Sequence, residues 1–295
     1  AVLPGSDPVL KDEIVLISAH YDHFGEGRMG AADNASGVAA VLELATRFST
    51  AQQAPKRTLV FVAFDCEERD LWGAVAFVMR KDVDPRAIVL NVNIDMLGRK
   101  GFDVMENTLF MAESHVLPSV HDDLAQVVNT TVLPIPSLAV SGRGDHAIFE
   151  KLNIPILMFT CGLYGDYHRK EDTLEKLDLE LLSASVNASE KSIASTVQVS
   201  SLEASPLPLT GSDATLASGN AMLSAMLDHP ENFNLTPNTI KICRKLHADT
   251  HAHLQKAKCN QATHNMLTMR GVFALTPIME SYEQSIFEDD REESN

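Results

Sequence analysis

Short apolar, β-branched runs alternate with longer segments of helical pattern along the first two thirds of the chain. The apolar runs lack a two-residue alternation, which indicates strands that are buried on both faces of a sheet. Strands that alternate with helices predict a three-layer α/β/α domain around a mixed, largely parallel central sheet. The predicted strands are 13–23, 58–68, 87–98 and 154–162, and the predicted helices are 34–50, 72–82, 119–130, 145–153 and 178–198.

The pattern changes near residue 200. Residues 199–215 are rich in Ser, Pro and Gly, which is typical of a linker, and 238–258 has the pattern of an amphipathic helix. We therefore predict a main domain over 1–200, a linker over 201–217 and a helical C-terminal extension over 218–295. The extension is expected either to cover the mouth of an active site or to mediate oligomerisation.

Composition narrows the class of protein. The 295 residues are 45% hydrophobic and 22% charged, as in ordinary globular proteins. A formal net charge of -16 argues against nucleic-acid binding, which needs a basic face. No apolar run approaches the ~18 residues of a membrane span. The chain begins AVLPGSDP, without an initiator Met or a signal pattern, which we interpret as a processed or trimmed chain.

Imidazole and carboxylate groups gather where the predicted strands end. His20 ends the first strand, Glu67 and Glu68 the second, and Asp95 the third, while His168 follows the fourth. The carboxyl ends of parallel strands meet at one edge of a sheet, so these groups are expected to lie together. Clustered carboxylates resist ionisation unless a cation is present, and mixed imidazole and carboxylate donors suit zinc. Two metal ions that share a bridging carboxylate would use all these donors.

The adjacent Glu67 and Glu68, and also Asp33, which lies between the first strand and its helix, each have a second interpretation. Neighbouring side chains of an extended segment point to opposite sides, so Glu67 and Glu68 are either both solvated or have different tasks in one pocket. Asp33 lies just ahead of a predicted helix, where a single Asp is more often a helix cap than a ligand.

His115 and His121 are interpreted as surface residues. The absence of HExxH and GxSxG motifs excludes a single-zinc helix site and a serine hydrolase.

Six motifs together carry a family resemblance. They are HYDH, GAADNASGVAAVLELA, FDCEERDLWGA, NVNIDMLG, GDHAIFEKLNIP and DYHRKEDT, in this order. A chain with these motifs over about residues 1–198 resembles the secreted bacterial zinc aminopeptidases, which are leucyl-aminopeptidase-like. They belong to a clan of co-catalytic di-zinc metallopeptidases that also contains glutamate carboxypeptidases and glutaminyl cyclases. The residues after 200 match nothing in that family.

The resemblance implies two Zn²⁺ ions per chain. Asp33 would bridge them, His20 and Asp95 would complete one site, and Glu68 and His168 would complete the other. None of these five ligand positions is altered from the family pattern.

The resemblance also implies how the remaining residues act. Glu67 would bind neither metal, and it would serve as general base toward the metal-bridging water and then as general acid toward the leaving amine. Tyr167 would polarise the scissile carbonyl. Asp22 would orient the imidazole of His20. Supporting positions behind the ligands are expected at Asp145 and Asp172.

Three positions depart from the family pattern. Asp70 stands where Gly is common, and Asp tolerates a left-handed backbone better than most residues. Ala74 replaces a Ser, a change that we expect to be harmless. Gly144 replaces the Ser of an SDH motif, and we expect a nearby hydrogen bond to be lost.

The resulting hypothesis is an aminopeptidase that acts on peptides with a free N-terminus. The resemblance implies a secreted or periplasmic location. A carboxypeptidase on the same metal site would need a basic pocket, which Arg28, Arg99 or Arg143 could supply. The same motifs also leave open a glutaminyl cyclase or a degenerate, non-catalytic binding protein. Intact ligand positions and an intact Glu67 argue against the degenerate protein.

Overall fold

A seven-stranded mixed sheet forms the centre of the protein, with strand order β1-β3-β2-β4-β8-β5-β7. β1 pairs antiparallel with β3 and β5 pairs antiparallel with β8, and the other neighbours are parallel. The computed structural model describes residues 1–25, 27–124, 127–206, 213–233, 235–255, 278 and 282–284. The strands of the sheet are Val2–Leu3 (β1), Ile14–His20 (β2), Thr58–Phe64 (β3), Ile88–Ile94 (β4), Thr108–Glu113 (β5), Thr131–Pro136 (β7) and Ile156–Thr160 (β8).

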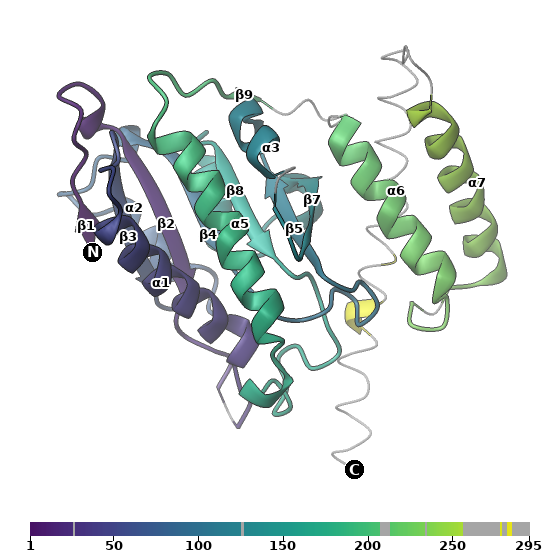
Figure 1. Ribbon diagram of the computed structural model, residues 1–295. Coiled ribbons are helices and arrows are strands. Elements are labelled where there is room, and N and C mark those ends of the chain that lie inside the picture. The colour runs from purple at the N-terminus through teal and green to yellow at the C-terminus, as the bar shows by residue number, and fades with distance from the viewer. Residues whose placement is uncertain are drawn as a thin grey trace.

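Helices cover both faces of the sheet, which confirms the predicted three-layer fold. One face packs on α1, α3 and α5, and α1 and α5 cross it side by side (Figure 1). The opposite face packs on α2 and α4 through an aromatic group that includes Phe64, Phe77 and Phe149. These helices are Gly37–Thr50 (α1), Trp72–Val78 (α2), Pro118–Leu124 (α3), His146–Lys151 (α4) and Leu179–Val197 (α5).

Three strands of the sheet, β1, β5 and β7, were not predicted. β7 contains Pro134 and Pro136, which argue against a strand in a sequence. It tolerates them because it pairs only with β5 and so lies at the edge of the sheet. The four predicted strands are confirmed as β2, β3, β4 and β8. The predicted helix 72–82 ends earlier, at Val78, and residues 127–130 of the predicted helix 119–130 are not helical.

The described part of the C-terminal extension packs on the main domain. β6 (His115–Val116) pairs with β9 (Ser205–Pro206) inside the predicted linker, and α6 (Asp213–Asp228) also begins there. α6 and α7 (Pro237–Leu254) lie beyond β7 (Figure 1). Their apolar side chains share one buried cluster with residues of β5, β7 and β8, among them Phe110 and Met158.

The cluster places the extension in a particular layer. Ile156 and Met158 point to the same side of β8, because side chains alternate along a strand. Ile156 packs in the α2 and α4 layer, so the extension continues that layer toward β7.

The predicted tail and the end of the predicted helix 238–258 lie outside the described residues. Within the described residues no helix combines the length and apolar character that crossing a membrane requires.

Candidate metal centre and active site

Five ligand candidates meet at the carboxyl edge of the sheet. His20 ends β2, Glu68 follows β3 and Asp95 follows β4. Asp33 lies in the turn ahead of α1, and His168 lies in the loop after β8. β2, β3, β4 and β8 run parallel, so segments that are far apart in sequence deliver these side chains to one place.

The five residues form two clusters that share Asp33. His20 Nε2 lies 3.2 Å from Asp33 Oδ1 and 3.2 Å from Asp95 Oδ1. His168 Nε2 lies 3.1 Å from Asp33 Oδ2 and 3.1 Å from Glu68 Oε2. Within each cluster one donor atom from each residue lies within 4.8 Å of the others. The two oxygens of Asp33 therefore face separate imidazoles, as a carboxylate that bridges two cations requires.

The chemistry of these donors fits zinc, which binds imidazole nitrogen and carboxylate oxygen. Burial raises the pKa of Asp95, and it opposes the ionisation of Asp33 as well. Hydrogen bonds from His168 and His20 nevertheless lower the pKa of Asp33 to about 2. The imidazoles of His20 and His168 thus stabilise the ionised carboxylate of Asp33, and a bound metal ion would provide that positive charge in their place. Glu68 Oε1 is buried without a hydrogen-bond partner among the described residues, which leaves a donor atom available to a cation.

Glu67 lies beside the clusters but belongs to neither. It lines the same cavity as the five ligand candidates. Burial, followed by the charge of Asp95, raises the pKa of Glu67 to about 9. A cation bound nearby would favour the carboxylate and bring this pKa back toward the neutral range that proton transfer needs. The two neighbouring glutamates thus occupy different environments, and the roles assigned to them stay predictions.

Asp22 supports more of the site than the sequence predicted. His20 Nδ1 lies 3.0 Å from the backbone oxygen of Asp22 and 3.5 Å from its Oδ1. The Asp22 carboxylate also accepts hydrogen bonds from the backbone N–H groups of Glu67, at 3.0 Å, and Glu68, at 3.3 Å. One carboxylate therefore fixes the end of β2 against the turn that carries both glutamates.

Asp172 and Asn34 hold the backbone around Asp33. Asp172 Oδ2 accepts a hydrogen bond from the N–H of Asp33 at 3.1 Å. Asn34 Nδ2 donates to the backbone oxygen of Ile94 at 3.0 Å, and its Oδ1 accepts from the N–H of Met96 at 3.2 Å. Asn34 thereby ties the turn before α1 to the end of β4, and the DN pair in the sequence was the only signal for this role.

Asp33 is not a helix cap. α1 begins at Gly37, and the residue before it is Ser36. Asp33 itself has a non-helical backbone, with φ -112° and ψ 88°, and its peptide bond to Asn34 is cis. Its carboxylate is directed at the two imidazoles instead.

Arg99 supports the site from behind, and the hypothesis that it binds a substrate carboxylate was wrong. It is 9% exposed, and it is not among the described residues that line the cavity. Its guanidinium pairs with Asp166, lies 3.4 Å from Asp172 Oδ1, and covers the ring of Tyr164 at 4.4 Å. The sequence could not show this because the partners come from a loop about 70 positions away.

The departures from the family pattern affect the backbone. Asp70 has φ +63°, so it adopts the left-handed conformation that the sequence predicted it would tolerate. Gly144 has φ +120°, and a Cβ added there would lie 3.1 Å from Asp95 Oδ2 and from His146 Nδ1. Asp145 is fully buried, and neither of its carboxylate oxygens has a hydrogen-bond partner among the described residues. Burial raises the pKa of Asp145 to about 7.

A cavity of about 360 Å³ opens onto both clusters. Tyr167 lines it, and its ring stacks on His168 with the ring centres 3.7 Å apart. Burial raises the pKa of Tyr167 well above its usual range, so the hydroxyl remains protonated and can donate a hydrogen bond. Phe24 also lines the cavity, 4.7 Å from the His168 ring. Sequence reasoning missed Phe24, because one aromatic residue in a turn belongs to no motif.

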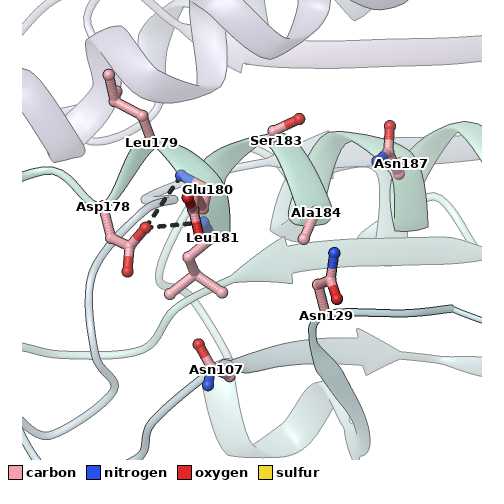
Figure 2. A pocket seen from close by; sticks show the side chains of 9 residues that line it. All are labelled: Asn107, Asn129, Asp178, Leu179, Glu180, Leu181, Ser183, Ala184 and Asn187. Atoms are coloured by element: carbon pink, nitrogen blue, oxygen red, sulfur yellow. Dashed lines mark hydrogen bonds between the residues drawn. The ribbon is translucent and has the colours of Figure 1, made fainter.

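A second cavity, of about 620 Å³, lies at the start of α5 (Figure 2). Asp178 lines it, but its carboxylate accepts hydrogen bonds from the N–H groups of Glu180 and Leu181, both at 3.0 Å. None of the described residues that line this cavity is a histidine or a cysteine. The larger volume therefore does not mark the catalytic site.

Two clusters of imidazole and carboxylate, one buried and one partly buried, lie at the carboxyl edge of an α/β/α sheet, an arrangement typical of metal-dependent hydrolases. The sequence profile of Peptidase family M28 matches residues 1–192. The chain therefore belongs to peptidase family M28, a family of zinc metallopeptidases.

Three known proteins illustrate the similarity. An aminopeptidase from Aneurinibacillus sp. strain AM-1 shares the fold with a TM-score of 0.56 and 26% identity, covering 70% of this chain and 48% of that one. Leupeptin-inactivating enzyme 1 of Streptomyces exfoliatus is 29% identical over 157 residues, which are 52% of this chain and 33% of that protein. A vacuolar membrane protease of Schizosaccharomyces japonicus is 26% identical over 167 residues, 55% of this chain and 19% of that protein. The chain thus spans less than half the length of each.

Proposed function

We propose that the protein is an aminopeptidase that binds two zinc ions and releases the N-terminal residue of peptides. The observation that carries the proposal is the position of Asp33, whose two carboxylate oxygens face His20 and His168 separately. Similarity to an aminopeptidase of known structure supports the choice of reaction.

The five ligand candidates divide between two metal positions. His20 and Asp95 would hold one ion, Glu68 and His168 would hold the other, and Asp33, which belongs to both clusters, would be shared. Bound zinc lowers the pKa of water and polarises a carbonyl group.

Glu67 and Tyr167 act on the substrate. Glu67 takes a proton from the attacking water and passes it to the leaving amine, since it lines the cavity without belonging to either cluster. The Tyr167 hydroxyl, which stays protonated, donates a hydrogen bond to the oxygen of the scissile carbonyl. Glu67 and Asp95 also offer negative charge to the free α-amine of the peptide.

The surroundings of the arginines favour an aminopeptidase over a carboxypeptidase. A carboxypeptidase needs a cationic group for the substrate's α-carboxylate. Arg99 is buried against Asp166 and Asp172, and Arg143 forms an ion pair with Glu283. Arg28 lies over the ring of Phe24, 4.8 Å from its centre.

The proposed location is outside the cytosol, secreted or periplasmic, which rests on the family resemblance. Similarity to a vacuolar membrane protease makes the vacuole the competing location. Fractionation of cells that express the full-length gene product would separate these locations. Oligomerisation through the extension stays a prediction, and sedimentation of the chain and of a version truncated near residue 205 would test it.

The function is tested with aminoacyl amide and peptide substrates. The zinc-loaded protein is expected to release the first residue of a free peptide and to leave the N-acetylated peptide intact. Chelation should abolish the activity and added zinc should restore it. Hydrolysis of the acetylated peptide from its C-terminal end would contradict the proposal and support a carboxypeptidase.

A further inference from the structure

The described residues of the C-terminal extension reach the active-site cavity. Glu283 lines the cavity, although it lies outside the residues that match the family profile. The adjacent Tyr282 is 5% exposed, and its hydroxyl donates a hydrogen bond to Asp103 Oδ2 at 2.6 Å. The Tyr282 ring packs on Phe102 and Phe233, with ring centres 5.6 and 5.5 Å apart. A buried neighbour therefore holds Glu283 at the cavity.

Glu283 and Arg143 form an ion pair with two hydrogen bonds. Arg143 Nη1 donates to Glu283 Oε1 at 2.8 Å, and Nη2 donates to Oε2 at 2.7 Å. Two parallel bonds match the planar guanidinium to the carboxylate, which makes this geometry stronger than a single contact. The two side chains are 45% and 21% exposed, so the pair stands where the cavity meets solvent.

Arg143 is distinctive in this cavity. Among the described residues that line it, Arg143 is the only lysine or arginine. Apart from the predicted ligands, the other charged groups in the lining are the carboxyl groups of Glu67, Asp70 and Glu283. A carboxylate that enters with a substrate therefore meets one lysine or arginine among the described lining residues, and Glu283 is already paired with it.

We propose that Glu283 is a specificity-determining residue that disfavours peptides with Asp or Glu at the N-terminus. The inference rests on the proposed aminopeptidase function. An acidic side chain in the cavity must break the Arg143–Glu283 pair or remain beside the carboxylates of Glu283 and Asp70. A neutral side chain neither has to break the ion pair nor is repelled by these carboxylates. Discrimination then comes from the cost of displacing Glu283 from Arg143, a cost that the extension adds to the M28 domain.

The test compares aspartyl and leucyl substrates in Glu283→Gln, which keeps the size of the side chain and removes its charge. The ratio of kcat/KM for the aspartyl substrate to that for the leucyl substrate should rise about tenfold, since an acidic side chain no longer has to displace the Glu283 carboxylate from Arg143. The gain should shrink at high ionic strength, because the pair is partly exposed. Activity on the leucyl substrate reports that the variant is folded.

Two further variants identify the cause. In the double variant Arg143→Gln/Glu283→Gln the gain should disappear, and a gain that persists there would overturn the proposal. Glu190→Gln is the matched control, because Glu190 also pairs with an arginine, Arg47, on the helices α5 and α1. It removes one negative charge far from the cavity and should leave the ratio unchanged.

The outcomes separate the inference from the proposed function. If the wild type hydrolyses leucyl substrates and Glu283→Gln keeps the same ratio, the inference alone fails. If the wild type hydrolyses no aminoacyl substrate, the aminopeptidase proposal fails. In that case, calorimetric titration of the zinc-loaded protein with L-aspartate and L-leucine makes the same comparison. Glu283→Gln should then tighten the binding of aspartate only, and equal affinities in both proteins would overturn the inference.

Discussion

Asp172 accepts a backbone hydrogen bond from Asp33 at 3.1 Å, although the two residues are 139 positions apart in the chain. The carboxylate of one residue thus sets the position from which the carboxylate of the other reaches both imidazoles. Arg99 lies against Asp172 from the opposite side, with Nη1 3.4 Å from Oδ1. The position of Asp33 is therefore fixed by a chain of contacts in which Asp33 is the only one of the five ligand candidates.

We predict that Asp172→Ala weakens zinc binding by about 10- to 100-fold, as losses of groups that support metal ligands typically do. Competition with a chelator of known affinity measures the change. Asp178→Ala is the control, because Asp178 also accepts two backbone hydrogen bonds but lies at the start of α5. Equal zinc affinities in Asp172→Ala and the wild type would contradict the supporting role.

The two neighbouring glutamates should show different effects on zinc content and on kcat when each is changed to glutamine. Glu67→Gln is expected to keep the zinc content of the wild type and to lose about 10²- to 10⁴-fold in kcat, because a general base is removed. Glu68→Gln should lose zinc, because it removes a charged donor 3.1 Å from His168. Zinc content per chain and kcat, measured on the same samples of both variants, test these two expectations. Loss of zinc in Glu67→Gln would show that Glu67 is itself a ligand.

Restoring the family residue at Gly144 should harm the protein. Gly144 has φ +120°, where a side chain is strained, and a Cβ would lie 3.1 Å from Asp95 Oδ2. We expect Gly144→Ser to lower the free energy of unfolding by about 1–3 kcal/mol and to weaken zinc binding through Asp95. Denaturation and chelator competition measure both effects. Ala74→Ser, which also replaces a residue of this chain by the serine of the family, serves for comparison. A Gly144→Ser variant as stable as the wild type would show that the loop can adopt another backbone.

His121 should stabilise the fold in a pH-dependent way. The Nε2 atom of His121 lies 2.8 Å from Oε2 of Glu113, and the Glu113 side chain is fully buried. The interpretation of His121 as a surface residue was therefore wrong. The hydrogen bond with Glu113 raises the pKa of His121 above its usual 6.5. Because the folded pKa is raised, the added stability is complete below pH 6.5 and is lost as the pH rises through the folded pKa.

The measurement is urea unfolding of the wild type and His121→Gln at several pH values. At about pH 6 the variant should be less stable by about 1–3 kcal/mol, since a buried carboxylate loses its charged partner. The difference should narrow as the medium becomes alkaline. A difference that is constant or grows with pH would contradict the assigned ion pair. His115→Gln is the control, since burial lowers the pKa of that residue.

The layers of the fold and the group of ligand candidates could both be predicted from local sequence patterns. Buried strands such as β2 and β4 have continuous apolar runs, and that pattern depends only on local chemistry. Residues at the ends of parallel strands must meet at one edge, so His20, Glu68 and Asp95 could be grouped before their distances were known.

The side chains that support or modify that group could be identified only from tertiary contacts. The Asp22 carboxylate accepts hydrogen bonds from the backbone N–H groups of two glutamates. Arg99 is buried against Asp172, and Glu283 of the extension lines the cavity. Each contact joins segments whose separation follows no period, so no local pattern encodes it. Such contacts depend on how the whole chain packs, and packing is set by the shapes of many side chains at once.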